Sequence, residues 1–491
     1  MQNLIKWALL LALFAPVIYF AMRQKKWYLY LLMAFTAILP EQFSISLHDK
    51  LPLITASRIL IIIAAAFWFF QRIRTRNFKI PVALAVFLAI NLIISLFHLI
   101  WDMDEIKRIF LLVMERGLVV AILVDMIDSR EEFDRCVDFM ILGCSVLAVV
   151  AICQTVLDYD IASVLHLRET FTSAMVSNRM GLVRAYATKN AITYGAYSAF
   201  MVLPIYYRLQ STGKQRYSVA IALNFVALFA TFTRSAWLCV IGVGGLVFLA
   251  QPAKLLKTLW KSIVLVLVLC VVFSFIQPKF GTALAETAKS SVNTVIKVLP
   301  AEWFAQKPQQ DLPSDTTPET TEPEFPGFEL SDDFGDNANN PSYSRLFQWS
   351  AVKYMAQNGQ LLLGNGYNAF LQGQIYFTHN SWGNDYKVAP VLDVGFVSII
   401  AESGLVGLLT YLGMLAYMVI RSLQKTRRGS FDFYKVMIFS SIMYLLLNIL
   451  SAFVNVALVW LMFGLFYAYE SLDKKGVLGE EPAQPERKWQ F

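Results

Sequence analysis

Charged residues are scarce in this 491-residue chain. Only 16% of the residues are Asp, Glu, Lys or Arg, and 57% are hydrophobic, whereas soluble proteins carry about 25% charged residues. Uncharged runs recur along the whole sequence, and a helix needs about 20 apolar residues to cross a bilayer core. These runs do not alternate with the period of two that marks the strands of a β-barrel. The composition therefore excludes a soluble globular protein and predicts an all-α polytopic membrane protein.

Cysteine and histidine are also few, at five and four residues. The cysteines lie in apolar runs or at their edges, and their odd number argues against a disulfide framework. No Cys-x-x-Cys pair or Cys/His cluster has the spacing of a zinc site. The acidic stretch DDFGDN (332–337) lacks the ligand spacing and terminal glutamate of an EF-hand calcium loop. We therefore expect neither a metal nor a cofactor.

Basic residues form short clusters between the apolar runs, although the net charge is +7. This is the pattern of the positive-inside rule, so we expect no nucleic-acid partner. All basic linkers fall on the cytoplasmic side when the N-terminus lies outside and the C-terminus inside. The first run, 4–20, lacks a convincing small-residue cleavage site and is interpreted as a retained helix. About 12–13 transmembrane helices are predicted, near 4–20, 27–40, 58–71, 80–99, 107–126, 137–157, 190–207, 217–232, 235–250, 262–277, 392–420, 434–451 and 453–469.

This topology divides the chain into four parts. Residues 1–277 hold the first ten transmembrane helices with short loops, 278–391 form one large external loop, 392–469 hold the C-terminal transmembrane helices, and 470–491 form a cytoplasmic tail. Within the loop, the acidic and Pro/Thr-rich part at about 309–341 is expected to be disordered. Its apolar and aromatic flanks are expected to fold.

The second flank of the large loop carries a helical pattern. Phe347, Ala351, Tyr354 and Met355 recur at i, i+4, i+7 and i+8, which predicts an amphipathic helix lying near the membrane. The GNG that follows at 364–366 predicts a tight turn. Its Gly-x-Gly spacing is weak evidence for phosphate binding.

Arg234 is the one charge between Tyr217 and Ala250. That stretch is too long for one span and just long enough for two short ones, so Arg234 falls at the outer turn of a helical hairpin. One interpretation is an arginine that snorkels to the headgroups. The other is an anion site, because arginine binds phosphate bidentately and a helix start adds free N–H groups beside Thr233 and Ser235. The residues alone leave both open.

A second basic cluster lies on the predicted external side, where the positive-inside rule makes it an exception. Arg179, Arg184 and Lys189 precede the span at 190–207. They can be structural, through a salt bridge to Asp158 or Glu169, or they can contact a second phosphate or a sugar.

The polar patch THNSWGND (378–385) contains His379. A lone histidine is often structural, but beside outer arginines it is a candidate general base because its unperturbed pKa lies near neutrality. Asp385, Asp393 and Glu402 are carboxylate alternatives. Glu402 lies about three turns into a predicted span, so it needs a partner or a cavity.

Three segments together resemble the O-antigen ligase and Wzy-type polysaccharide polymerase superfamily. The first segment, ATFTRSAWLCVIGVGGLVF (230–248), is similar to the family's T-x-S-R-G-A stretch, although the order here is Thr-Arg-Ser-Ala. The second segment, 184–200, is similar to the family's R-x-x-G-x-x-x-x-N-x-x-x-x-A region, from which Ala187 and Lys189 depart. The third segment consists of residues 344–370 together with THN and AESGLVGLLTYL, and it resembles the family's large external loop and the helix that follows. In the family this region reads R-x-x-x-W, G-x-G-x-x-x-F, H-N and then E-x-G-x-x-G. An Asp-x-Gly-aromatic at 393–396 separates His379 from that helix and is similar to exopolysaccharide polymerases, which favours polymerase over ligase.

The resemblance implies a GT-C-like, metal-independent glycosyltransferase in the bacterial inner membrane, with its active site facing the periplasm. It implies polymerisation of undecaprenyl-diphosphate-linked repeat units into O-antigen or exopolysaccharide, with a lipid-linked oligosaccharide as donor and acceptor. Transfer to a lipid A core or a protein by a ligase is the alternative. Arg184 and Arg234 would stabilise the leaving diphosphate and His379 would deprotonate the acceptor. In-line attack would invert the anomeric centre.

Further substrate contacts are predicted from these basic clusters, turns and motifs taken together. The residues predicted to bind substrate are Arg179, Lys189, Asn190, Thr233, Ser235, Arg345, Gly364, Gly366, Asn380, Asp393 and Glu402. The partners that the resemblance implies, besides the bilayer, are a chain-length regulator and a flippase of the same pathway.

A transporter or flippase is the main alternative class. It should show ionisable residues at the mid-plane of several spans and broken helices in paired repeats. Glu115 and Arg116 are the clear mid-span pair, and they can neutralise each other. Because the other candidate charges gather on one side, the sequence favours chemistry at one face over passage.

Overall fold

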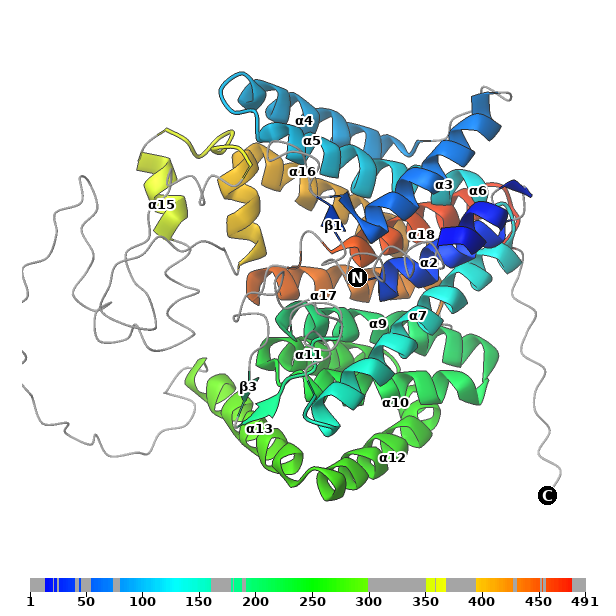
Figure 1. Ribbon diagram of the computed structural model, residues 1–491, viewed down its shortest axis with the longest axis vertical. Coiled ribbons are helices and arrows are strands. Elements are labelled where there is room, and N and C mark those ends of the chain that lie inside the picture. Colours follow the sequence, from blue (N-terminus) through cyan, green and yellow to red (C-terminus); the bar gives the residue numbers. More distant parts are fainter. Residues whose placement is uncertain are drawn as a thin grey trace, which may run out of the picture.

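The computed structural model is an all-α polytopic membrane protein, as predicted (Figure 1). It describes residues 14–20, 22–23, 26–39, 44–45, 54–73, 80–159, 178–179, 181–187, 191–298, 350–357, 359–367, 394–426, 431–450, 453 and 456–478. Within these residues, five helices are long and apolar enough to cross a membrane, and several shorter apolar helices accompany them.

The first half of the chain forms hairpins of apolar helices and two short β-hairpins. Its helices are α2 (Trp27–Ile38), α3 (Ala56–Ile73), α4 (Val82–Leu99), α5 (Glu105–Leu111), the π-helical η1 (Leu112–Leu118), α6 (Val119–Met126), α7 (Arg130–Val156), α9 (Ala191–Thr212) and α10 (Gln215–Ala230). Strand β1 (Ser44–Ile45) pairs antiparallel with β2 (Ile54–Thr55), and β3 (Asn178–Arg179) pairs antiparallel with β4 (Leu182–Val183).

The second half begins with the predicted helical hairpin. Its helices are α11 (Arg234–Ala250), α12 (Pro252–Ile276), α13 (Pro278–Val298), α15 (Ser350–Gln357), α16 (Gly395–Lys425), α17 (Phe433–Leu450) and α18 (Ala457–Lys474). Helices α13 and α15 lie in the predicted external loop, which confirms that its flanks fold. The predicted amphipathic helix around Ala351 and Met355 is α15, while Phe347 lies outside the described residues.

The helices pack in two groups joined by α17. Helices α3 to α6, α16 and α18 lie in the upper part of Figure 1, and α9 to α13 lie in the lower part. Helix α17 packs against α16 on one side and against α9 and α11 on the other. The membrane helices run roughly across the view, with β3 and α15 at the left. Segments predicted to be external therefore gather at one end of the bundle.

Some basic segments that the sequence predicts only as linkers between spans form the first turns of helices. Helix α7 begins at Arg130, where the Ser129 hydroxyl accepts a hydrogen bond from the Glu132 N–H (3.2 Å). Helix α12 begins at Pro252, which suits the first helical turn because proline lacks an N–H. The predicted spans thus lie inside longer helices that carry their basic residues beyond the apolar run.

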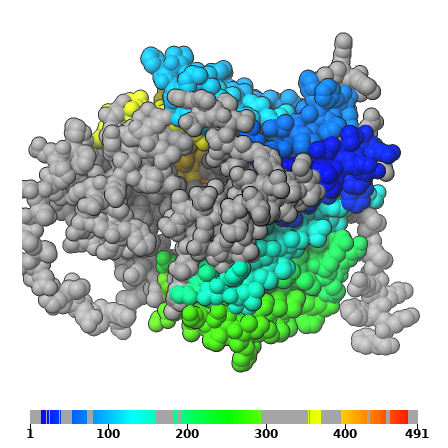
Figure 2. All heavy atoms as spheres, in the orientation of Figure 1, coloured from blue at the N-terminus to red at the C-terminus, as the bar shows by residue number. Residues whose placement is uncertain are grey.

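Helix α12 faces away from the rest of the bundle. Leu267, Val271 and Phe275 are 60%, 55% and 82% exposed. The green segment that contains α12 forms the lower edge of the space-filling view (Figure 2). An apolar surface of this kind is suited to lipid, which completes the burial that the protein does not provide.

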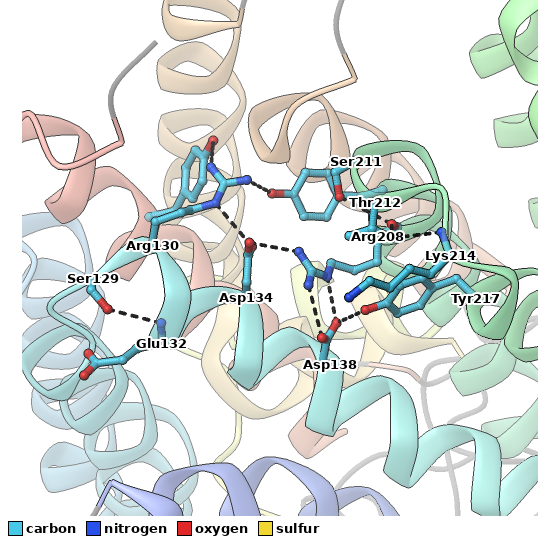
Figure 3. A network of polar contacts seen from close by, with 12 residues as sticks. Ser129, Arg130, Glu132, Asp134, Asp138, Arg208, Ser211, Thr212, Lys214 and Tyr217 are labelled. Atoms are coloured by element: carbon cyan, nitrogen blue, oxygen red, sulfur yellow. Dashed lines mark hydrogen bonds and ion pairs between the residues drawn. The ribbon is translucent and has the colours of Figure 1, made fainter. Parts of the chain in front are cut away.

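A network of polar contacts ties the predicted cytoplasmic ends together (Figure 3). The Arg208 guanidinium, 7% exposed, lies 2.7 Å from Asp138 Oδ1 and 2.9 Å from Asp134 Oδ2. Arg130 pairs with Asp134 at 3.2 Å, and the Tyr217 hydroxyl donates to Asp138 at 2.6 Å. Segments 128–135 and 208–216, which the sequence places on one side of the membrane, therefore lie together.

Glu115 and Arg116 do not neutralise each other, which corrects one sequence-based expectation. Adjacent helical residues point in different directions. The Glu115 carboxylate lies 2.6 Å from Arg58 Nε on α3. Arg116 donates to the Tyr411 hydroxyl and lies over the Tyr411 and Trp460 rings, 5.5 and 5.3 Å from their centroids. Each charge thus has its own partners on other helices, and both occur in the π-helical segment η1.

Candidate functional site

The turn between α10 and α11, predicted to lie on the outer side, brings the two predicted catalytic arginines together. Arg234 is the first residue of α11. Arg184 follows β4 and reaches the same turn, where its Nε donates to the Thr231 carbonyl (2.7 Å) and its second terminal nitrogen donates to the Thr233 hydroxyl (2.9 Å). The Ala185 N–H donates to the Ala230 carbonyl (2.9 Å). Segments that are far apart in the sequence therefore build one basic turn.

The turn itself is tightly packed. Phe232 has φ +49° and is 1% exposed, and its ring centroid lies 6.0 Å from that of Phe280 on α13. Gly195 of α9 lies so close that an added Cβ would come within 2.9 Å of Thr233. This close approach lets the Thr233 hydroxyl bond the Ala191 carbonyl at the start of α9 (3.1 Å). The packing fixes the direction in which α11 begins.

Helix α11 begins without a side-chain cap. Thr233 occupies the N-cap position, but no side-chain bond to the first-turn N–H groups is made there. The hydroxyl is engaged with the Ala191 carbonyl and the Arg184 guanidinium. The positive end of the helix dipole favours an anion at this point. Ser235, which is 5% exposed, belongs to the same first turn.

Arg234 is half-buried and donates to the Ser290 hydroxyl of α13 (2.6 Å). Among the described residues, no carboxylate lies within ion-pair distance of it. Snorkelling alone does not require a helix to cover an arginine at the interface. Together, α13, the hairpin turn and Arg184 form a basic site at the outer end of α11.

The other predicted members of this site are only partly described. The backbone of Arg179 lies in β3, opposite Leu182. Asp158, one proposed salt-bridge partner of the basic cluster, accepts a hydrogen bond from the Val183 N–H (2.8 Å) and so holds β4. Predicted residues outside the described part of the chain are Lys189, Asn190, Arg345, His379, Asn380 and Asp393, as are Glu169 and Asp385.

A second structured region lies where α16 is broken. Gly404 has φ +65° and ψ −168°, which is non-helical and in the region that favours glycine. Residues 361–367 of the large loop insert at the break. The N–H groups of Leu405 and Val406 donate to the carbonyls of Leu361 and Leu362 (2.9 and 3.2 Å). The loop therefore supplies the bonds that the helix gives up, as a break at membrane depth requires.

Gly364 and Gly366 have a packing role at this break, with φ +77° and +87°. A Cβ on Gly364 would lie 2.6 Å from the Ser403 N, and one on Gly366 would lie 2.7 Å from Glu105 Oε1. The N–H groups of residues 364–367 are all engaged, with the Gln360, Ala401 and Glu402 carbonyls and the Glu105 carboxylate. The phosphate contact predicted from GNG is therefore not supported, because a phosphate loop needs free N–H groups.

Glu402 lies two residues before the break and is partly buried. Its carbonyl accepts hydrogen bonds from Arg108 (2.8 Å) and from the Gly366 N–H (3.2 Å). Burial, together with the nearby Glu402 carboxylate, raises the pKa of Tyr367 to about 12. Tyr367 thus remains a neutral hydroxyl at neutral pH, next to a carboxylate inside a membrane helix.

Sequence analysis missed three side chains that hold this region. The Arg108 guanidinium also donates to the Ser403 hydroxyl, Glu105 accepts from the Tyr367 N–H (2.5 Å), and His98 Nε2 lies 3.0 Å from the Leu363 carbonyl. In the sequence, Glu105 and Arg108 look like solvated charges at the start of a span. Their burial, at 0% and 4% exposed, depends on a loop more than 250 positions away.

Comparison with known proteins agrees with the predicted resemblance. Residues 219–412 match a family model described as O-antigen ligase. This stretch includes the turn at Arg234, α13, the 361–367 insertion and the broken part of α16. Comparison with curated proteins gives no match.

The family indicates an O-antigen ligase- or polymerase-type membrane enzyme whose substrates are lipid-linked glycans. It does not distinguish the ligase from the polymerase. The chain is thus a membrane protein in which residues 219–412 match the O-antigen ligase family domain, and this match supports the predicted resemblance to the O-antigen ligase and Wzy-type polymerase superfamily.

Proposed function

We propose that this protein is a polysaccharide polymerase of the bacterial inner membrane. It joins undecaprenyl-diphosphate-linked repeat units into O-antigen or exopolysaccharide on the periplasmic face. The observation that carries this proposal is the pair Arg184 and Arg234 at the uncapped start of α11. Two guanidinium groups and the positive end of the α11 dipole favour the binding of a diphosphate.

The proposed chemistry follows from the leaving group. As the glycosidic bond breaks, negative charge develops on the diphosphate oxygens. Arg184 and Arg234 stabilise this charge, and one well-placed donor of this kind contributes about 3–4 kcal/mol. The acceptor hydroxyl attacks the anomeric carbon from the opposite face, so the configuration inverts. Since a diphosphate leaves readily once its charge is stabilised, this route needs no metal.

A base must remove the proton of the acceptor hydroxyl. His379 remains the predicted base, and it lies outside the described residues. Glu402 remains the carboxylate alternative, because it is partly buried and lies beside the loop segment 361–367. A pH–rate profile separates the two, since a histidine base loses activity near its ordinary pKa of about 6.5 and a carboxylate base well below it.

A ligase is the second candidate, because the matching family model is described as O-antigen ligase. Its acceptor would be a lipid A core or a protein in place of a second lipid-linked repeat unit. The donor site at Arg184 and Arg234 would be the same. The two functions therefore differ only in what the acceptor side recognises.

The test uses purified protein in nanodiscs with an undecaprenyl-diphosphate-linked repeat unit. Glycan length is followed on a gel, with and without EDTA, for the wild type and for Arg184→Ala and Arg234→Ala. Arg135→Ala is the matched control, because Arg135 is an exposed arginine that pairs with Glu131 of the same helix.

A ladder that survives EDTA and the control substitution, and is lost in both outer-arginine variants, supports the polymerase. Product that forms only after a lipid A core is added supports the ligase. Full activity in Arg184→Ala and Arg234→Ala would overturn the diphosphate site.

A further inference from the structure

Gln154 lies near the C-terminal end of α7, within a predicted span, and is 1% exposed. A buried amide is unfavourable unless its polar atoms are hydrogen-bonded. Both polar atoms of this side chain bond the backbone of the segment that follows β4. Its Oε1 accepts from the Ala187 N–H (2.7 Å) and, at a longer 3.4 Å, from the Tyr186 N–H, and its Nε2 donates to the Ala187 carbonyl (3.3 Å). Gln154 therefore binds Ala187 as a neighbouring strand would.

The backbone of Ala187 needs this support because its conformation is unfavourable. Its φ is +51°, in the left-handed region that is costly for a residue with a Cβ. The residue is 3% exposed, so its N–H and carbonyl depend on protein partners instead of water. Gln154 satisfies both groups with one side chain. Backbone conformations of this kind persist only where the surroundings hold them, and they are frequent at functional positions.

Asp158 lies four positions after Gln154 and binds the same segment. Its Oδ1 accepts from the Val183 N–H (2.8 Å). Asp158 has φ +50°, which aspartate tolerates better than most residues do. The two side chains therefore hold the chain on both sides of Arg184, one residue before it and three residues after it.

The path of this backbone decides what the Arg184 side chain can reach. Its guanidinium donates to the Thr231 carbonyl and the Thr233 hydroxyl (2.7 and 2.9 Å), and the residue is partly exposed. A misplacement of about 1 Å in an active site can cost about 100-fold in rate. The contacts from α7 therefore contribute to the geometry of the basic turn, although α7 supplies none of its charge.

We propose that Gln154 and Asp158 are positioning residues for the donor site. They hold the segment 183–187 so that the Arg184 guanidinium meets the leaving diphosphate, and they act through Arg184 without touching the substrate themselves. This inference rests on the proposed glycosyl transfer and deepens its donor side. It assigns a role to the end of α7, a helix that lies outside the stretch matched by the family model.

The test uses the full-length protein in nanodiscs and two readouts. One is the binding of undecaprenyl diphosphate alone, and the other is transfer from the lipid-linked repeat unit. Gln154→Met removes the hydrogen bonds to the segment and keeps the length of the side chain. It should raise the Kd for undecaprenyl diphosphate, and lower kcat/KM for the donor, by about 10-fold each, the scale expected when buried backbone groups lose their partner.

Thr155→Val is the matched control for a substitution at this end of α7. Thr155 is the next residue, is 0% exposed, and its hydroxyl has no hydrogen-bond partner among the described residues. Valine keeps the branched shape of threonine. The Kd and kcat/KM of this variant should stay within about 2-fold of the wild type.

Asp158 gives a second pair of variants at an exposed position, where the fold is expected to be retained. Asp158→Gly removes the acceptor of the Val183 N–H and tolerates the positive φ. Asp158→Asn keeps an acceptor oxygen and removes only the charge. Asp158→Gly should show the same losses as Gln154→Met on a smaller scale, and Asp158→Asn should restore wild-type binding and transfer.

Double variants with Arg184→Ala separate positioning from packing. If Gln154 and Asp158 act through Arg184, then Gln154→Met and Asp158→Gly cause no further loss of binding or transfer once Arg184→Ala is present. A side chain that only stabilises the fold would instead lower the Tm by the same amount in both backgrounds and leave the Kd per folded molecule unchanged.

The outcomes that would overturn the inference differ from those that would overturn the proposed function. Losses that multiply in the double variants, or a lower Tm with an unchanged Kd and kcat/KM, would refute the positioning role alone. So would an Asp158→Asn variant as impaired as Asp158→Gly, together with a fully active Gln154→Met. If Arg184→Ala binds undecaprenyl diphosphate and transfers glycan as the wild type does, the donor site itself is refuted.

Discussion

The Arg184 guanidinium donates to the Thr231 carbonyl and the Thr233 hydroxyl, so one arginine fixes both sides of the outer turn between α10 and α11. The same turn sets the start of α11 and hence the position of Arg234. Arg184 can therefore act on a bound anion directly and through the shape of the turn. Its two roles can be separated by substitution.

Arg184→Lys should reduce activity because a lysine keeps the charge but cannot donate to Thr231 and Thr233 as a fork. We expect kcat/KM to fall by about 10- to 100-fold, with the Tm within a few degrees of the wild type. Thr233→Val is the companion variant, since it removes the hydroxyl that accepts a hydrogen bond from Arg184 and leaves Arg184 in place. The rate of donor consumption and a thermal melt check both. An unchanged rate in Arg184→Lys would mean that the charge alone suffices.

Gly404→Ala should destabilise the protein because the break requires φ +65°, and an added Cβ would meet the Leu362 carbonyl. The expected loss is about 1–3 kcal/mol from backbone strain, with more from the clash. Gly413→Ala, on the same helix, is the matched control, since a Cβ there meets nothing within 4 Å. It should leave the Tm equal or higher. Equal Tm values for Gly404→Ala and Gly413→Ala would contradict the non-helical conformation at Gly404.

Asp138→Asn should weaken the network that Figure 3 shows, because Asp138 accepts from Arg208, Arg216 and Tyr217. Removing one partner of a largely buried pair costs about 3 kcal/mol. Glu131→Gln, which breaks the exposed pair with Arg135, should cost less than about 1 kcal/mol. Chemical unfolding measures both. Activity per folded molecule should be unchanged, since the network lies away from the outer site.

Asp128 predicts a dependence on pH at the same end of the bundle. Burial alone would raise the pKa of this carboxyl. The contacts with Lys475 and Lys26 lower the pKa by more than burial raises it, so the pKa lies below its usual value. A depressed pKa stabilises the fold above the unfolded-state pKa, about 3.9, and this contribution is lost as the pH falls below it. The Tm of Asp128→Asn should therefore lie below that of the wild type at pH 7 and converge with it as the pH falls from the unfolded-state pKa through the lower pKa of the folded state. A constant difference across that range would show that charge is not involved.

The sequence predicted the hairpin of α10 and α11 because a single charge in a long apolar run has few places to lie. It also predicted that 128–135 and 208–216 share a side, because charge distribution records topology. The break in α16 could not be predicted. Gly404 stands in a run whose pattern equally fits a continuous helix, and its partner segment, 361–367, comes from another part of the chain.

Arg108 and Glu105 were missed for a related reason. Near the end of a predicted span, charged residues usually face water or headgroups. Contacts with α16 and with the inserted loop segment 361–367 make them interior, and a periodicity argument does not detect contacts between distant segments. In contrast, Arg234 was found because it interrupts a pattern locally. Sequence analysis thus located the basic turn at Arg234 and not the side chains that hold the break in α16.

The broken helix has a consequence for how such proteins can diversify. The large loop is anchored at one end by α13, packed against α10 and α11, and at the other by residues 361–367, set into α16. Both anchors belong to the bundle, whatever connects them. Because the entropy of closing a loop grows only slowly with its length, segments between the anchors can be exchanged or lengthened at little cost in stability. A new glycan specificity could thus be acquired by grafting a different insert, with the membrane machinery left as it is.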